Sequence, residues 1–367
     1  MADLVQRKIE AMLPDLEHWV KQELFTPQEV RAIVKKRREL EYKMTRKIPL
    51  RSDFKRAIDY ESKLLKLTLS RQSTLNEEFE KSKHDFHVQS RIQDIFRVAL
   101  RKFDDIDLWD AYLSFLIKVK SYKIANAEFV RSLELHANIP QLWIKAAIFS
   151  FDQMNDTQAA QVFFQRALRV HPKNTEIWLS FFAMMCKQYE DQQRSEDLSS
   201  LTSIYSYAFQ SLPSTLENHL KFITVIDGVD VEIPLLKNIL EFIVEEFADE
   251  EQAWIVYAKH LSLKRAIEMF KTQMDSNDDK DSVISKAFVN YLYENGIECE
   301  RVHPELITFL ESYSPDLDRI IKLLTCYLCC GMVEQAIQKW NEIIPTLSPS
   351  DSTTLTAQFK LLSTFTL

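Results

Sequence analysis

Apolar residues recur at helical spacing along most of this 367-residue chain. Within residues 30–42, one helical stripe is expected to combine apolar, aromatic and one basic side chain: Val30, Ile33, Val34, Arg37 and Tyr42. A following helix is predicted to open at Ser52 or Asp53 and to carry a second stripe: Phe54, Ile58, Glu61, Leu64, Leu65 and Leu69. The pattern predicts a run of helices over about the first 85 residues.

Capping residues mark where these helices begin. Asp3 is placed to cap a first helix that ends near residues 12–14, and Pro14 suits the first turn of a second helix. Thr26-Pro27-Gln28-Glu29 is a capping box, because the Thr26 hydroxyl can accept from the Glu29 amide while the Glu29 carboxylate reaches back. This box predicts a third helix that starts directly after Thr26.

Tryptophans recur at a regular interval in the remainder of the chain. Trp109, Trp143 and Trp178 are 34 and 35 residues apart, and Trp254 follows 76 residues later. That last interval covers two periods, with Asn218 at the intervening tryptophan position. Each tryptophan opens a similar apolar segment, which predicts a repeated helix.

A second helix of each repeat is expected around a small residue. The small residues are Ala99, Ser132, Ala167 and Ala208, and prolines close the repeats at Pro140, Pro172 and Pro213. A period in the mid-thirties built from paired helices is typical of an α-solenoid. We expect each tryptophan to pack against a small residue, because helix backbones approach closely there, and we expect these positions to form core.

Composition supports a helical chain and excludes several classes of site. Only three glycines are present, whereas open α/β and all-β folds use glycine at turns and phosphate loops. Neither a Rossmann nor a Walker motif can be written with three scattered glycines. No apolar stretch reaches about 18 residues and the N-terminus lacks an apolar core, so neither a membrane span nor a signal peptide is expected. Five irregularly spaced cysteines fit a reducing compartment.

Charge is distributed unevenly along the chain. The net charge is −8, yet residues 1–103 hold 23 Lys and Arg against 16 Asp and Glu. The strongest basic run is a candidate RNA-contacting or partner-contacting segment: Arg31, Lys35, Lys36, Arg37, Arg38, Lys43, Arg46 and Lys47. It either docks on RNA phosphates or an acidic protein surface, or is a solvated helix face paired with nearby acids. We expect it to lack the interleaved exposed aromatic residues of a base-stacking platform, so that any RNA contact is to phosphates.

Two groups of polar residues are candidate sites of chemistry. Cys326, Cys329 and Cys330 with Cys299 and His303 have zinc-type spacing, but the surrounding apolar residues favour buried free cysteines. His84, Asp85 and His87 precede a helix, where isolated histidines are common. We therefore expect no catalytic residue, no metal site, no bound cofactor and no small-molecule substrate.

The repeats resemble the half-a-tetratricopeptide (HAT) family. The tetratricopeptide glycine, four residues after the tryptophan, is replaced by Leu113, Ala147, Phe182 and Ala258. The segment from Phe163 to Pro172 is similar to the end of a HAT unit. This resemblance implies a right-handed superhelical α-solenoid and a scaffold role in RNA processing.

The N-terminal segment narrows the resemblance. It carries Ile9-Glu10-x3-Pro14-x-Leu16-Glu17, then Leu24-Phe25-Thr26-x2-Glu29-Val30-x2-Ile33-Val34-Lys35-Lys36-Arg37, then Glu41-Tyr42, then Asp53-Phe54-x5-Tyr60-Glu61. These residues resemble the U3 small nucleolar RNA-associated protein 6 family over roughly residues 1–175, and the chain is expected to be a shortened form or to lack some repeats. The domains predicted are a family-specific helical region, 1–85, which runs into the first repeat, and a HAT solenoid, 86–367.

The resemblance implies a non-catalytic subunit of the small-subunit processome, in the UTP-B subcomplex of the nucleolus. Its implied partners are WD-repeat propeller proteins and, directly or indirectly, the U3 ribonucleoprotein and pre-ribosomal RNA. No membrane partner is expected. A HAT scaffold of messenger-RNA splicing or 3′-end processing is the alternative, and a metal-dependent or hydrolytic enzyme is a remote third possibility.

Overall fold

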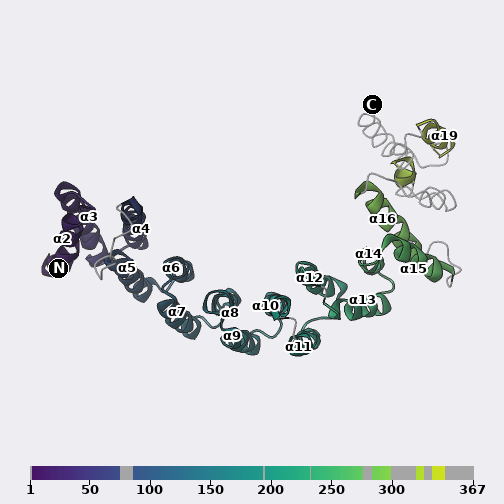
Figure 1. Cartoon of the computed structure of the whole chain (residues 1–367), viewed down its shortest axis with the longest axis horizontal. Helices are drawn as coiled ribbons and strands as arrows, with labels where there is room; N and C mark the ends of the chain where they lie inside the picture. Colours follow the sequence, from purple (N-terminus) through teal and green to yellow (C-terminus); the bar gives the residue numbers. More distant parts are fainter. Residues whose placement is uncertain are drawn as a thin grey trace. The chain divides into compact units, whose positions relative to one another are not determined.

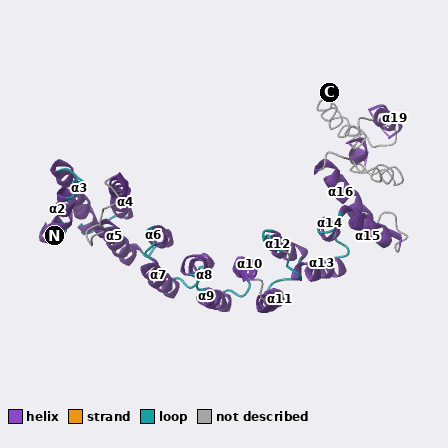
Figure 2. Ribbon diagram, viewed as in Figure 1, coloured by secondary structure: helices purple, strands orange, loops and turns teal. Residues whose placement is uncertain are grey.

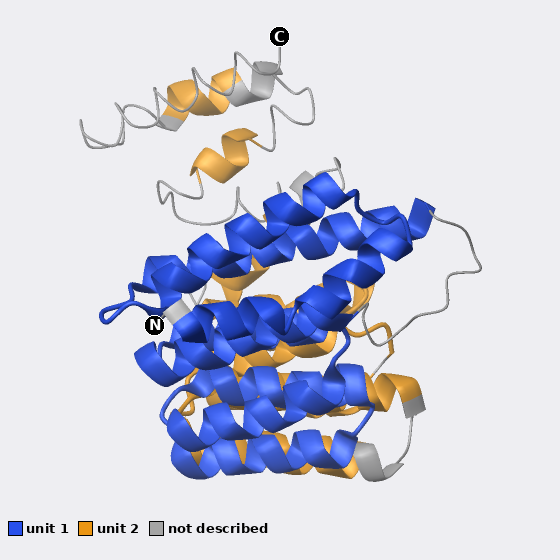
Figure 3. Cartoon of the chain, turned by 90° about the vertical axis from the view of Figure 1, so that its left-hand side faces the viewer, with its two compact units in different colours: residues 1–171 blue, residues 172–367 orange. Residues whose placement is uncertain are grey.

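The computed structural model describes residues 2–74, 86–192, 195–231, 233–275, 283–298, 320–325 and 333–343. Within these ranges the chain is helical, with loops between helices and no strand (Figure 2). The all-α prediction is confirmed for this part of the chain. The chain divides into two compact units, residues 1–171 and 172–367 (Figure 3).

Unit 1 carries helices α1 to α9 among its described residues (Figure 1). Their bounds are α1 Ala2–Glu10, α2 Leu13–Lys21, α3 Pro27–Thr45, α4 Arg51–Thr74, α5 His87–Phe103, α6 Ile106–Lys118, α7 Tyr122–Leu135, α8 Pro140–Met154 and α9 Thr157–Val170. From α2 to α8, each helix packs against the helix that follows it. Helix α1 packs on α3. Packing between sequence neighbours is what a repeat of helix pairs requires.

Unit 2 continues with the same alternation of helices and short connections. Its described helices are α10 Thr175–Gln192, α11 Ser195–Ser211, α12 Leu216–Asp227, α13 Leu235–Glu246, α14 Glu251–Lys259, α15 Leu263–Asp275, α16 Val283–Glu298 and α19 Val333–Ile343. Here α10 contacts both α11 and α12, and α14 contacts α13, α15 and α16. Helices two positions apart therefore share a core in this unit.

The start of α3 follows its predicted cap. The Thr26 hydroxyl accepts from the Glu29 amide, and the Glu29 carboxylate accepts from the Thr26 amide at 2.9 Å, which closes the capping box. Arg71 of α4 donates to both Glu29 oxygens, so the cap also joins two helices. Hydrogen bonds from Arg71, and then from the Thr26 backbone, lower the pKa of Glu29 to about 2. The predicted capping box is confirmed.

The predicted boundary at residue 85 lies inside unit 1. α4 and α5 pack together on its two sides, so the N-terminal helices and the first repeats form one compact unit. Two residues of the predicted stripes are exposed: Tyr42 is 46% exposed and Leu69 is 51% exposed. The neighbouring helices therefore cover only part of the predicted stripes of α3 and α4.

Candidate functional site

A buried cluster of charges joins four helices of unit 1. Arg37 of α3 donates from Nε and Nη2 to the two carboxylate oxygens of Glu61 in α4, at 2.9 and 2.7 Å. Arg91 of α5 donates to Glu61 at 2.7 Å and to Glu41 of α3 at 3.0 Å. Lys8 of α1 donates to the second Glu41 oxygen at 2.9 Å. The cluster therefore fixes α1, α4 and α5 around α3.

Burial makes this cluster sensitive to the loss of any one charge. The Arg37 and Glu61 side chains are 0% and 1% exposed. Burial favours the protonated carboxyl of Glu61, but the nearby guanidinium groups of Arg37 and Arg91 outweigh it and hold the pKa of Glu61 below its usual value. Arg37 was expected in a partner-facing basic segment; that expectation was wrong, because its partner Glu61 lies in the helix packed against it.

Three other members of the predicted basic segment form ion pairs within the protein. Lys36 and Lys43 hold the carboxylate of Glu39 at 2.9 and 2.6 Å, and Arg46 holds Asp53 at 2.5 Å. The four remaining residues are exposed and make no ion pair with any described residue: Arg31, Lys35, Arg38 and Lys47. The structure thus divides the segment into residues paired within the protein and exposed residues without an ion pair to the described part of the chain.

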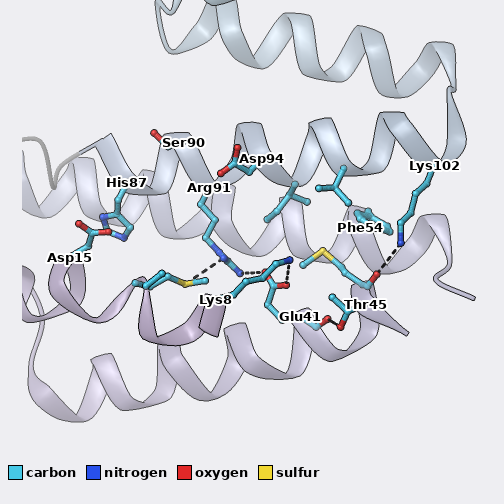
Figure 4. Close-up of a pocket in the computed structure, with 15 residues that line it drawn as sticks. Lys8, Asp15, Glu41, Thr45, Phe54, His87, Ser90, Arg91, Asp94 and Lys102 are labelled. Atoms are coloured by element: carbon cyan, nitrogen blue, oxygen red, sulfur yellow. Dashed lines mark hydrogen bonds and ion pairs between the residues drawn. The ribbon is translucent and has the colours of Figure 1, made fainter. Parts of the chain in front are cut away.

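A cavity of about 520 Å³ opens beside the buried cluster. Figure 4 shows Lys8, Glu41 and Arg91 meeting along its wall, with Asp15 and His87 near one end and Lys102 near the other. The Lys102 amine lies 5.6 Å from the centre of the Phe54 ring. Lys8, Glu41 and Arg91 of this wall join α1, α3 and α5.

No group of three or more His, Cys, Asp or Glu side chains that could hold a metal occurs among the described residues. His87 packs its ring 4.5 Å from that of Trp19. The other residues weighed for chemistry lie outside the described part of the chain: His84, Asp85, Cys299, His303, Cys326, Cys329 and Cys330. Among described helices, none is both long enough and apolar enough to span a bilayer.

The predicted repeat-packing residues are all buried. The tryptophans Trp109, Trp143, Trp178 and Trp254 are 1–8% exposed, and the small residues Ala99, Ser132, Ala167 and Ala208 are 0% exposed. In unit 1, α6 lies against α7 and α8 against α9, so each tryptophan-bearing helix is paired with the helix that follows it. Large indoles on one helix and small residues on the other allow that close approach.

The tryptophans also make a recurring hydrogen bond that sequence inspection had not identified. Three indoles donate to the backbone carbonyl six residues earlier, in the loop before their own helix: Trp143 to Ala137, Trp178 to Pro172 and Trp254 to Ala248, at 2.8–2.9 Å. At the expected tryptophan position in α12, the Asn218 amide donates to the Pro213 carbonyl at 3.1 Å. The same loop-closing bond therefore marks equivalent positions in both units.

Histidines add a second bond at two of these loops. His171, which follows α9, is placed to donate from Nε2 to the Ala137 carbonyl at 3.1 Å, the oxygen that Trp143 also uses. One period earlier, His136 and the Trp109 indole both contact Asp104 Oδ1, at 2.9 and 3.3 Å. The His136 bond, then the Trp109 bond, lower the pKa of Asp104. These bonds tie each loop to the next repeat.

A buried histidine lies at the centre of an aromatic cluster in unit 2. His219 of α12 stacks on Phe209 at 3.8 Å, and its two ring nitrogens contact the hydroxyls of Tyr205 and Ser214 at 2.6 and 3.1 Å. Burial lowers the pKa of His219 to about 4, since the apolar surroundings disfavour the charged ring. The ring is therefore neutral at physiological pH.

The N-terminal region of the sequence, which forms the first helices of unit 1, matches a model of a protein family. The model of the U3 small nucleolar RNA-associated protein 6 family matches residues 9–94, the region that contains Arg37, Glu41, Glu61 and Arg91 of the buried charge cluster. The human U3 small nucleolar RNA-associated protein 6 homolog is 29% identical over 269 residues, which is 73% of this chain and 40% of that protein. These matches confirm the family resemblance drawn from the N-terminal motifs.

Two further relatives match a shorter stretch. The mouse U3 small nucleolar RNA-associated protein 6 homolog is 34% identical over 185 residues, which is 50% of this chain and 31% of that protein. The protein of the same name from Schizosaccharomyces pombe is 31% identical over 185 residues, covering 50% and 38%. The matched part of this chain therefore spans well under half of the length of each relative.

Proposed function

We propose that this protein takes part in the maturation of small-subunit ribosomal RNA, as a non-catalytic scaffold that associates with the U3 ribonucleoprotein. The observation that carries the proposal is the match of residues 9–94 to the U3 small nucleolar RNA-associated protein 6 family. The relatives of that name extend the similarity beyond this region, over as much as 269 residues in the human protein. By this proposal the protein belongs to the small-subunit processome, in its UTP-B subcomplex, and acts in the nucleolus.

The scaffold part of the proposal rests on the repeated helix pairs. We assign them to a right-handed HAT solenoid, in which every repeat offers a surface to an extended partner. The loop-closing bonds of Trp143, Trp178, Asn218 and Trp254 support the assignment of equivalent repeats along the chain. WD-repeat propeller subunits are the protein partners that we propose for this surface.

The proposal of a non-catalytic role has support in how the polar side chains are used. In the buried charge cluster of unit 1, the side chains of Arg37, Glu61 and Arg91 are paired with one another. The His219 ring is occupied by two hydroxyls and enclosed by aromatic side chains. Such groups stabilise a fold, and we propose that the protein works by binding alone.

Affinity purification of the tagged protein from nuclear extract tests this function. We expect U3 RNA and propeller subunits to be recovered together with the protein. Recovery of splicing or 3′-end cleavage factors without U3 RNA would reject the proposal and favour the messenger-RNA alternative. The match of residues 9–94 is the reason for preferring the ribosomal role, because HAT repeats alone fit both.

A further inference from the structure

One face of α3 carries three cations and an exposed aromatic ring in a single row. Arg31, Lys35, Arg38 and Tyr42 are separated by four, three and four residues, which places them on the same side of a helix. The row is about 16 Å long at the helical rise per residue. We call these four residues the α3 row.

The α3 row is held on a rigid support. The opposite side of α3 is buried through Ile33, Arg37, Leu40, Glu41 and Met44. The capping box at Thr26 fixes the start of the helix, and the buried pair of Arg37 with Glu61 fixes its middle. The backbone positions of the three cations are therefore held at a constant spacing, which lowers the entropy cost of binding a partner.

No carboxylate of α3 neutralises the row. The helix contains three acidic residues, and each is bound by other cations. Glu29 is held by Arg71, Glu39 by Lys36 and Lys43, and Glu41 by Lys8 and Arg91. Arg31, Lys35 and Arg38 thus form a local positive stripe on a chain whose net charge is −8.

We propose that the α3 row binds single-stranded RNA, with the three cations against successive phosphates and the Tyr42 ring stacked on a base. The inference builds on the proposed function, since it gives the protein a direct contact with the RNA of its assembly. Tyr42 decides between RNA and an acidic protein segment: its ring is 46% exposed beside the cations, where a base can stack on it. An acidic protein segment would bind to the three cations and would not require an exposed aromatic ring.

Binding of labelled oligouridine to the purified full chain, over a series of salt concentrations, tests the proposal. The triple variant Arg31→Glu, Lys35→Glu, Arg38→Glu is expected to bind at least about tenfold more weakly. Loss of three phosphate contacts should also reduce the slope of log K against log salt by about 2. Tyr42→Ala should weaken binding about tenfold and Tyr42→Phe should not, because phenylalanine retains the stacking face.

A matched control reverses the same number of positive charges at other exposed positions of unit 1. Arg101→Glu, Lys118→Glu, Lys123→Glu changes three exposed cations outside the row, and it should bind oligouridine nearly as well as the unchanged chain. An RNA duplex separates stacking from charge, since Tyr42→Ala should leave duplex binding unchanged.

Equal losses for the row variant and the control variant would overturn the proposal, and so would failure of the unchanged chain to bind oligouridine. Loss of an acidic protein partner by the row variant, with RNA binding intact, would assign the row to a protein instead. Recovery of U3 RNA by the unchanged chain from nuclear extract is a separate result. It decides the proposed function whichever way the row behaves.

Discussion

Arg37 and Glu61 lie 24 residues apart in the sequence and meet in a two-point ion pair from which solvent is excluded. The pair holds α3 against α4, and Arg91 extends it to α5. Three helices of the region matched by the family model therefore depend on one carboxylate. A buried pair of this kind is costly to break from one side, because the remaining charge has no water to solvate it.

Removing the cation of this pair should destabilise unit 1 strongly. Arg37→Ala is expected to lower the free energy of unfolding of α3 and α4 by about 3 kcal/mol, because the buried Glu61 carboxylate keeps only Arg91 as a partner. Hydrogen exchange of peptides from α3, α4 and α5 measures this loss locally. The exposed neighbour Lys36, whose pair with Glu39 is solvent-accessible, is the control, and Lys36→Ala should change stability by less than about 0.5 kcal/mol.

Replacing both members with apolar residues should restore part of the loss. In Arg37→Met, Glu61→Met no charge of this pair remains buried, and Arg91 keeps its bond to Glu41. The double variant is therefore expected to be more stable than Arg37→Ala. If it were less stable than Arg37→Ala, the prediction would be wrong, and the bond from Arg91 to Glu61 would contribute more than the removed charges cost.

The capping box predicts a second, smaller effect at the start of α3. Thr26→Ala removes the oxygen that accepts from the Glu29 amide and should cost about 1 kcal/mol in urea unfolding. Thr202→Ala in unit 2 removes a hydroxyl that only bonds within its own helix, so it should cost less. Equal losses in the two variants would show that the cap contributes nothing specific.

The loop-closing bond of Trp143 can be separated from its packing. Trp143→Phe keeps an aromatic ring in the core but loses the donor to the Ala137 carbonyl, which His171 still contacts. We expect a loss of about 1 kcal/mol for this change. Trp143→Ala also empties core volume and should cost about 3–5 kcal/mol. Asn218→Ala, which removes the equivalent bond in unit 2, should resemble Trp143→Phe when measured by exchange of the adjoining loop.

Local signals in the sequence were sufficient to predict much of the fold. The capping box at Thr26 involves residues three apart, and the Trp positions follow a fixed period, so both are visible without knowing which helices touch. The same period placed Asn218 at a tryptophan position, and its amide makes the same loop-closing bond there. Features of this kind depend only on sequence separation.

Other features depended on contacts that spacing cannot give. Arg37 carries a charge on an inward stripe, and only the approach of Glu61 from α4 explains why it is buried. Tyr42 lies at the edge of that stripe, and its exposure follows from how much of α3 the neighbouring helices cover. The division of the basic segment into internal ion pairs and the α3 row follows from the same long-range packing.

The His219 cluster predicts that unit 2 loses stability in mild acid. The pKa of His219 is lowered to about 4 in the folded chain, whereas an unfolded histidine has a pKa of about 6.5. Between these values the unfolded chain binds the extra proton, so stability is present above about pH 6.5 and falls as the pH approaches 4. Hydrogen exchange of α11, α12 and α13, corrected for the intrinsic effect of pH, measures this change.

His219→Phe provides the comparison for the acid response. It leaves the hydroxyls of Tyr205 and Ser214 without their ring partner, so its stability at neutral pH should fall. Its loss of stability between about pH 6.5 and pH 4 should nevertheless be smaller than that of the unchanged chain, because position 219 then has no imidazole that becomes protonated on unfolding. If both chains lost the same stability over this interval, the acid response would belong to other groups and the His219 ring would be open to water.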